Sequence, residues 1–232
     1  MRIDILTLFP KMFDGFLNES IIKRAISNKK VEVNIYDIRS FSSDPHKKVD
    51  DYSYGGGAGM VLMPQPIFDA VDALKKDNSF VILVTPQGVP YKQSIAYDLT
   101  KKEHIIIICG HYEGFDERIR TLADIEISIG DYVLTGGELA SMVISDSVIR
   151  LLDGVITKES YENDSFTDNL LDYPVYTKPY DFRGMKVPDI LLSGHHEKIN
   201  EWRKNEQIKK TQIRRPDLLE KRWIRWKMNN IY

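Results

Sequence analysis

The stretch that decides the fold is Ile105-Ile106-Ile107-Ile108-Cys109-Gly110-His111-Tyr112-Glu113-Gly114. Its first half is a continuous apolar run, which is typical of a strand covered on both faces. Its second half is a polar loop with two glycines. A similar run at Phe80–Val84 precedes the polar loop Thr85-Pro86-Gln87-Gly88. Such strands predict a parallel sheet flanked by helices, and ligands of these sheets bind beyond the carboxyl ends of the strands.

Apolar runs and amphipathic segments alternate along the chain, which predicts an α/β fold. The expected strands are Ile3–Phe9, Val31–Ile38, Phe80–Val84, Ile105–Cys109 and Ile125–Ile129. The expected helices are Ser20–Ser27, Ile67–Lys75, Ser94–Lys101, Asp116–Leu122, Glu138–Leu152, His196–Thr211 and Pro216–Met228.

A third loop lies between the last expected strand and the helix from Glu138. It reads Ile129-Gly130-Asp131-Tyr132-Val133-Leu134-Thr135-Gly136-Gly137. Adjacent glycines bring backbone N–H and C=O groups close to a ligand. This stretch alone fits a ligand-binding bend and an ordinary strand-to-helix connection equally well.

Four glycines cluster in Tyr54-Gly55-Gly56-Gly57-Ala58-Gly59-Met60. The cluster lacks the spacing of a dinucleotide-binding turn and the Gly-Lys-Ser/Thr ending of a P-loop, which argues against a nicotinamide dehydrogenase and a nucleoside triphosphatase. A backbone lying close to a ligand and a plain flexible loop both stay open.

Composition indicates a soluble protein. The 232 residues are 42% hydrophobic and 28% charged, and no apolar run reaches the length of a membrane span. A single cysteine, Cys109, permits no intramolecular disulfide and fits a reducing cytoplasm. Because Cys109 ends an apolar run, we interpret it as a buried structural thiol. No serine lies in a nucleophile elbow and no histidine pair has zinc-helix spacing.

Charge is uneven. The net charge is −2, yet residues 198–232 hold 11 Lys and Arg against 4 Asp and Glu, together with Trp202, Trp223 and Trp226. Basic and aromatic side chains side by side suit a phosphate backbone and unstacked bases. A solvated helix face with tryptophans in its core is the alternative. The polar stretch 157–174 is expected to be a mobile linker.

Many strings resemble the bacterial tRNA (guanine-N1)-methyltransferases, the TrmD family of the SPOUT class. In chain order they are 54–60, 85–88, 109–114, 116–118, 130–139, 164–166, 170–174, 193–196 and 214–219. These strings are spread over most of the chain. The resemblance implies a parallel sheet with a C-terminal trefoil knot at 1–157, a flexible interdomain linker at 158–174 and a helical tRNA-binding domain at 175–232.

The resemblance also implies an S-adenosylmethionine site in the three loops. The matching cofactor positions are Pro86, Gly110, Tyr112, Glu113, Gly114, Ile129, Tyr132, Leu134, Gly136 and Gly137. S-adenosylmethionine has no phosphates, which accounts for the missing nucleotide fingerprint. Glu113 matches an acidic position near the sulfonium and is the candidate that helps to place Mg²⁺, on which the family's activity depends.

The implied reaction is methyl transfer to N1 of the guanosine immediately 3′ of the anticodon, in tRNAs whose preceding base is guanosine. This reaction supports reading-frame maintenance. N1 carries a proton, so a general base is required. Asp164 matches the family's catalytic aspartate. Arg150 matches its partner arginine and is suited to the negative charge that develops toward O6. A solvated linker aspartate and a helix C-terminal cation are the plain alternatives.

The tRNA is expected to contact Gly55, Gly59, Ser165, Asp172, Lys210, Arg214 and Arg215. The contacted part is the anticodon stem-loop. The family works as a homodimer in which one subunit's cofactor site meets the other's C-terminal domain. This chain departs from many relatives at four positions, where we expect Arg, Pro, Pro and Gly respectively: His111, Ala140, Asp153 and Asn169.

Two other functions stay open at this level. One is a SPOUT methyltransferase that acts on another RNA position. The other is an RNA-binding protein without catalysis, which would have no affinity for S-adenosylmethionine.

Overall fold

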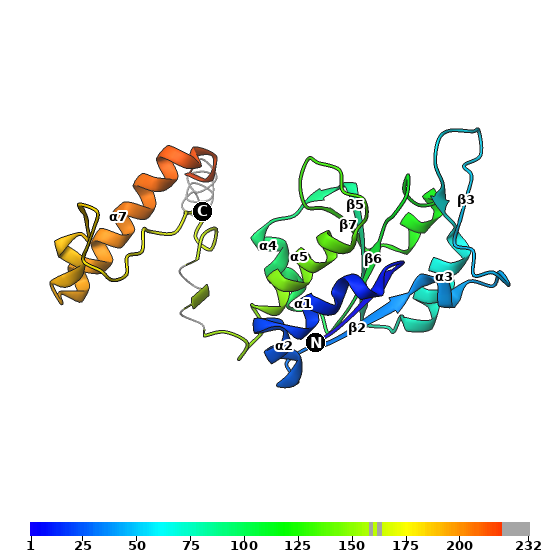
Figure 1. Ribbon diagram of the computed structural model, residues 1–232, viewed down its shortest axis with the longest axis horizontal. Coiled ribbons are helices and arrows are strands. Elements are labelled where there is room, and N and C mark those ends of the chain that lie inside the picture. The colour runs from blue at the N-terminus through cyan, green and yellow to red at the C-terminus, as the bar shows by residue number, and fades with distance from the viewer. Residues whose placement is uncertain (158–159, 162–163, 220–232) are drawn as a thin grey trace, which may run out of the picture. The chain divides into compact units, whose positions relative to one another are not determined.

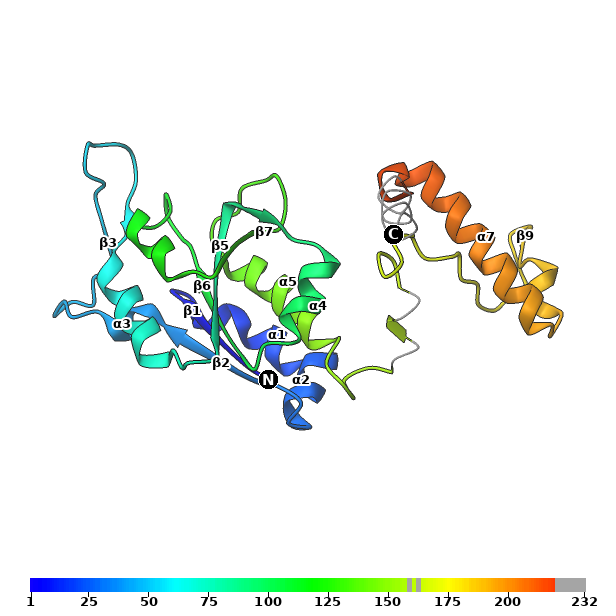
Figure 2. The same cartoon turned by 180° about the vertical axis from the view of Figure 1, so that it is seen from behind.

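The computed structural model describes residues 1–157, 160–161 and 164–219. These residues form two compact units, Met1–Ile156 and a second that begins at Thr157. Figure 1 and Figure 2 show the chain from two opposite sides.

The first unit is built on a five-stranded sheet in the order β2-β1-β6-β5-β7. All neighbouring strands are parallel, which confirms the predicted parallel sheet. The strands are β1 Arg2–Thr7, β2 Glu32–Asp37, β5 Ser79–Pro90, β6 His104–Cys109 and β7 Ile125–Ser128.

Helices lie on both faces of the sheet (Figure 1). They are α1 Asp14–Asn18, α2 Ser20–Ser27, α3 Pro64–Leu74, α4 Gln93–Leu99 and α5 Glu138–Ile149. On one face α5 packs with α2 and α4. On the other, α3 packs with two short 3-10 helices, Ile38–Phe41 and Glu117–Leu122. A further 3-10 helix, Pro10–Phe13, precedes α1.

Alternating residues of β6 explain why its whole run is apolar. Ile106 and Ile108 are fully buried in the cluster that contains Ile67 and Val71 of α3. Cys109 Sγ lies 3.0 Å from Ser141 Oγ of α5, so odd residues of the strand face the other layer. Both faces of the strand are therefore covered, as the sequence predicted.

Two helices are shorter or tighter than predicted. Residues 117–122 form a 3-10 helix, which Asp116 begins by accepting a hydrogen bond from Arg118 N. The segment ends at once because Ala123 is extended. Helix α5 stops at Ile149 and Leu152 N bonds Ile149 O, a 3-10 pattern that tightens the last turn before Gly154.

The sequence did not predict the hairpin that carries the glycine cluster. Strands β3 Asp50–Asp51 and β4 Val61–Leu62 are antiparallel, and the glycines lie in the loop between them. Leu62 N donates to Gly114 O, which joins the hairpin to the loop after β6.

A buried polar network lies at the amino ends of β1 and β6. The Asp4 carboxylate is fully buried. It accepts hydrogen bonds from Arg2 Nε at 2.9 Å and Asn34 Nδ2 at 3.0 Å, and lies 2.9 Å from His104 Nε2. His104 Nδ1 lies 2.7 Å from Ser79 Oγ, so four strands are tied together here.

The second unit contains α7 His196–Arg214, the 3-10 helix Asp189–Leu192 and a hairpin of β8 Asp181–Phe182 and β9 Met185–Lys186. Residues 216–219 are helical, and Pro216 is the first of them. The rest of the predicted helix Pro216–Met228, with Trp223 and Trp226, falls outside the described residues.

Part of the predicted linker is tied to α7. Leu171 N donates to Thr211 Oγ1 at 2.9 Å, and both Leu170 and Thr211 are buried. The flexibility of 158–174 as a whole stays a prediction, but residues 164–173 belong to the second unit. No helix among the described residues is long and apolar enough to cross a membrane.

Candidate functional site

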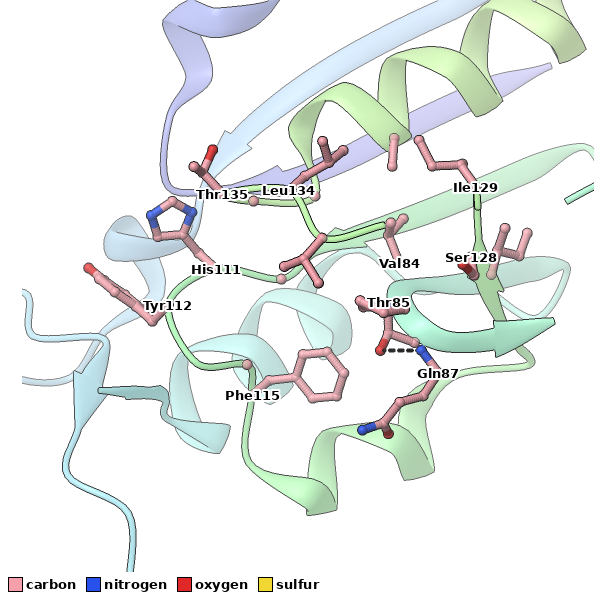
Figure 3. A pocket seen from close by; sticks show the side chains of 18 of the residues that line it. Val84, Thr85, Gln87, His111, Tyr112, Phe115, Ser128, Ile129, Leu134 and Thr135 are labelled. Atoms are coloured by element: carbon pink, nitrogen blue, oxygen red, sulfur yellow. Dashed lines mark hydrogen bonds between the residues drawn. The ribbon is translucent and has the colours of Figure 1, made fainter. Parts of the chain in front are cut away.

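A cavity of about 380 Å³ lies at the carboxyl ends of β5, β6 and β7 (Figure 3). All ten residues predicted to hold the cofactor line it: Pro86, Gly110, Tyr112, Glu113, Gly114, Ile129, Tyr132, Leu134, Gly136 and Gly137. Three segments far apart in the sequence thus form one pocket, at the edge of the sheet where the sequence placed it. The predicted loop Thr85–Gly88 is not a loop after a strand but an irregular part of β5, where the pairing with β7 shifts register between Val84 and Val89. That these residues contact a cofactor stays a prediction.

Two of the loops join through their backbones. Gly137 N donates to Gly110 O at 2.8 Å, and His111 forms a bridge with Gly136. A Cβ at Gly137 would lie 2.9 Å from Cys109 Cα and from Gly110 N. Only glycine allows this close approach, so the bend at 129–139 is shaped by the neighbouring loop.

A buried carboxylate anchors the bend at 129–139 to the end of β1. Glu138 begins α5 and is 2% exposed. Its Oε1 accepts a hydrogen bond from Thr7 Oγ1 at 2.7 Å, and Thr7 Oγ1 also accepts from Phe9 N. The end of β1 is therefore tied to the helix that follows the bend. A negative side chain at this position also suits the helix N-terminus.

The glycine hairpin meets the pocket at Glu113. Glu113 N donates to Met60 O at 3.0 Å, and a Cβ at Gly59 would lie 2.8 Å from Glu113 Oε1. Gly59 has φ +83°, a conformation that side chains rarely adopt. The structure thus brings the predicted substrate residue Gly59 against the predicted cofactor residue Glu113. Gly55 lies in the same loop, and a Cβ added there would meet no atom within 4 Å beyond its chain neighbours.

Tyr112 is a bulky residue with φ +59°. Such a conformation is strained for an aromatic residue and is typical of ligand sites. Burial and the nearby Asp50 raise the pKa of the Tyr112 hydroxyl, while Arg39 acts in the opposite direction. The hydroxyl therefore stays protonated at neutral pH.

His111, one of the departures from relatives, packs its ring 4.8 Å from both Phe9 and Tyr112. Its buried Nδ1 has no hydrogen-bond partner among the residues that the structure describes. Ala140 is buried in the pocket wall. Asn169 has φ +56°, which both Asn and the expected Gly adopt readily.

Sequence reasoning missed Arg120. Its guanidinium bonds Gln87 of β5 and Glu126 of β7, and it lies 2.9 Å from Glu117. It braces two walls of the pocket. No periodicity marks it, because the 3-10 helix that carries it is too short to have an amphipathic pattern.

Burial raises the pKa of the Cys109 thiol far above its usual value, and nearby Glu138 adds to this effect, while Ser141 opposes it. Cys109 is thus not a thiolate nucleophile, which agrees with its interpretation as a structural residue.

The predicted catalytic pair is divided between the units. Arg150 follows the last turn of α5 in the first unit, and its N–H bonds Asp146 O. Asp164 lies in the second unit, where Thr167 N bonds its backbone oxygen. The catalytic roles of Arg150 and Asp164 stay predictions.

The remaining predicted substrate residues lie in the second unit. Asp172 N donates to Ser165 Oγ at 3.0 Å, which brings these two together. Lys210 and Arg214 are on α7. Arg215 follows it and forms a two-pronged pair with Asp217, at 2.8 Å for each contact.

Among the described residues, no group of three or more His, Cys, Asp or Glu side chains could hold a metal ion. The side chains around Glu113 that the structure describes therefore do not form a protein cage for Mg²⁺. The Mg²⁺ requirement stays an expectation from the resemblance.

A pocket beyond the carboxyl ends of a parallel sheet defines an α/β protein with a candidate small-molecule site. Residues 1–221 match the family model described as tRNA (Guanine-1)-methyltransferase TrmD. The chain belongs to this family.

Curated relatives match this chain in sequence over nearly their full length. A tRNA (guanine-N(1)-)-methyltransferase from Geobacillus kaustophilus is 60% identical, with 95% of this chain and 92% of the relative covered. The protein of that name from Anoxybacillus flavithermus is 58% identical, with 99% of each covered. That from Mycoplasma capricolum is 56% identical, with 95% and 92% covered.

Proposed function

We propose that this protein transfers a methyl group from S-adenosylmethionine to N1 of the guanosine immediately 3′ of the anticodon, in tRNAs whose preceding base is guanosine. The observation that carries the proposal is the single pocket formed by the three loops, in a chain of the TrmD family. The modification supports reading-frame maintenance. A tRNA substrate implies a cytoplasmic location.

The pocket suits the cofactor. A volume of about 380 Å³ is within the range of small-molecule sites. Its walls include apolar side chains such as Leu134 and Ile129, which suit an adenine ring, and exposed backbone groups of glycines. Bound S-adenosylmethionine would supply an electrophilic methyl group on its sulfonium. We also propose the family's trefoil knot, which the close packing of Gly137 on Gly110 supports.

The protein's own groups would prepare the guanine. Asp164 would take the N1 proton, which frees the nitrogen lone pair for attack. Arg150 would stabilise the charge that moves to O6 and orient the ring. Because Asp164 belongs to the second unit, the base would be presented only when that unit engages RNA, which would couple catalysis to the correct substrate.

We propose a homodimer as well. Helix α5 buries Ile144 and Val148 but exposes Leu139 and Val143, and Val133 in the preceding loop is 85% exposed. Exposed apolar side chains on a helix next to a ligand loop are typical of a subunit interface. Analytical ultracentrifugation tests this directly: a Leu139→Lys, Val143→Lys variant should sediment as a monomer.

The test of function uses labelled S-adenosylmethionine and tRNA transcripts that differ only at the two guanosines, followed by mapping of the methyl group. Label on N1 of the second guanosine, lost in Asp164→Ala, supports the proposal. Label elsewhere would identify a methyltransferase of another position. Absence of cofactor binding by calorimetry would favour an RNA-binding protein without catalysis. Adding EDTA to the reaction tests the Mg²⁺ requirement.

A further inference from the structure

One wall of the pocket at the carboxyl ends of the strands is a bulge in β5. Val84 and Val89 are both paired with Ile127 of β7, so residues 85–88 are extra relative to the neighbouring strand. Bulges are frequent next to ligand sites, where they change the direction of side chains. The members of this bulge that line the pocket are Thr85, Pro86 and Gln87.

Gln87 connects the bulge to another element. Gln87 N donates to Thr85 Oγ1 at 3.3 Å, a hydrogen bond within the bulge (Figure 3). The side-chain oxygen of Gln87 accepts a hydrogen bond from the guanidinium of Arg120. The 3-10 helix that carries Arg120 therefore reaches the bulge through this side chain.

Arg120 joins the bulge to β7. Its guanidinium also donates to Glu126 of β7, and its Nε lies 2.9 Å from Glu117 Oε2. The planar group lies 5.1 Å from the ring centroid of Phe115, and the side chain is only 19% exposed. A guanidinium carries its N–H donors in a rigid fork, so one arginine can hold several acceptors at fixed positions. Arg120 thus fixes the bulge relative to the neighbouring strand.

The contacts of Arg120 indicate how it would act on a ligand. Each of its three guanidinium nitrogens already donates to a side chain of the protein. The group would therefore influence a ligand through the wall that it holds. The two carboxylates of Glu117 and Glu126 outweigh its single positive charge, so Arg120 does not make this wall repel a cationic ligand.

We propose that Arg120 is a positioning residue for the cofactor, which sets the affinity of the pocket for S-adenosylmethionine by holding the bulge 85–88 against β7. The inference rests on the proposed function for the identity of the ligand. It assigns Arg120 a role in binding and none in methyl transfer, for which the proposed groups are Arg150 and Asp164.

The test is calorimetry of S-adenosylmethionine and S-adenosylhomocysteine binding to the full chain carrying Arg120→Met. We expect both ligands to bind about fivefold or more weakly, which corresponds to about 1 kcal/mol for one lost hydrogen bond. In transcript methylation, KM for S-adenosylmethionine should rise while kcat at saturating cofactor stays within about twofold of the wild type. Arg118→Met is the matched control. It removes the same charge from the same 3-10 helix, but Arg118 pairs with Asp116 and does not line the pocket, so cofactor affinity should be unchanged.

A second variant tests the path of the effect. Gln87→Met removes the acceptor on the bulge. If Arg120 acts through the bulge, the double variant should bind the cofactor about as weakly as Arg120→Met alone, because residues that share one interaction are not additive. Fully additive losses would overturn the proposal. An Arg120→Met protein that unfolds at lower urea concentration but keeps wild-type affinity would also overturn it, since Arg120 would then serve stability alone.

If Arg120→Met fails to fold, as judged by circular dichroism, Arg120→Lys replaces it. This variant keeps the charge, loses the fork and should still weaken both ligands. Weaker binding of S-adenosylmethionine without weaker binding of S-adenosylhomocysteine would indicate an effect of charge and would contradict positioning. A wild-type protein that does not bind S-adenosylmethionine refutes the proposed function. Tight binding by the wild type and by Arg120→Met alike refutes this inference alone.

Discussion

Gly137→Ala is the sharpest test of how the cofactor pocket is built. Gly137 has φ −81°, so alanine meets no backbone strain there. The obstacle is the new Cβ, 2.9 Å from Cys109 Cα and from Gly110 N. Both atoms are backbone, and ordinary carbon contacts are about 3.5–4.0 Å. The two loops must therefore separate by roughly half an ångström or more.

The cost follows from the contacts. Overpacking of this kind costs about 1–3 kcal/mol. Separation also weakens the hydrogen bond from Gly137 N to Gly110 O, worth about 1 kcal/mol. If the strain stays in the folded protein, the free energy of unfolding falls. If the loops move apart to relieve it, affinity for S-adenosylmethionine falls, by about tenfold for each 1.4 kcal/mol.

The assay combines calorimetry with S-adenosylmethionine and urea unfolding of the cofactor-free protein. The losses in binding and unfolding free energy should together reach about 2 kcal/mol or more. Gly15→Ala is the matched control, because its Cβ would meet no atom within 4 Å and it lies in α1. A Gly137→Ala protein with wild-type affinity and stability would refute the close-packing argument.

Three further predictions concern stability and reactivity. Burial raises the pKa of Asp4, but its hydrogen-bonded partners outweigh burial and hold that pKa below its usual value. The ionised carboxylate therefore stabilises the fold fully above the unfolded pKa of about 3.9. This stabilisation is lost as the pH falls through the lower folded pKa. Urea midpoints measured from pH 7 to 2 should fall more steeply for the wild type than for Asp4→Asn. Cys109→Ala should keep methyl transfer, and native Cys109 should react with a disulfide reagent only at the rate of unfolding. Thr7→Val leaves Glu138 without its buried donor and should cost about 1–3 kcal/mol of unfolding free energy, whereas Thr121→Val, on an exposed hydroxyl, should cost little.

The sheet and the place of the pocket were predictable because they follow from local patterns. A strand buried on both faces must be apolar throughout, so β6 was recognisable from Ile105–Cys109 alone. Polar loops after such strands meet at one edge of the sheet, and the glycines mark where backbones approach. The predicted residues of the three loops therefore lie around one cavity.

What the sequence did not predict depends on contacts across long separations. The hairpin β3–β4 has two residues per strand, too few for an alternating pattern. Arg120 braces the pocket through Gln87 and Glu126, a pairing that no local spacing encodes. The attachment of Leu171 to Thr211 spans 40 residues. The composition of a polar stretch with few apolar side chains does not predict single hydrogen bonds of this kind.

In the proposed mechanism, the division between the two units separates methyl-donor binding from base presentation. The walls of the pocket at the carboxyl ends of the strands are held in place by Glu138, Thr7 and Arg120, all in the first unit. The loop of Asp164 is anchored on α7 by the buried Thr211. The predicted general base thus lies on a loop that α7 supports. Variants of α7 should therefore change the RNA dependence of catalysis while leaving cofactor affinity intact, since every residue that lines the pocket at the carboxyl ends of the strands belongs to the first unit.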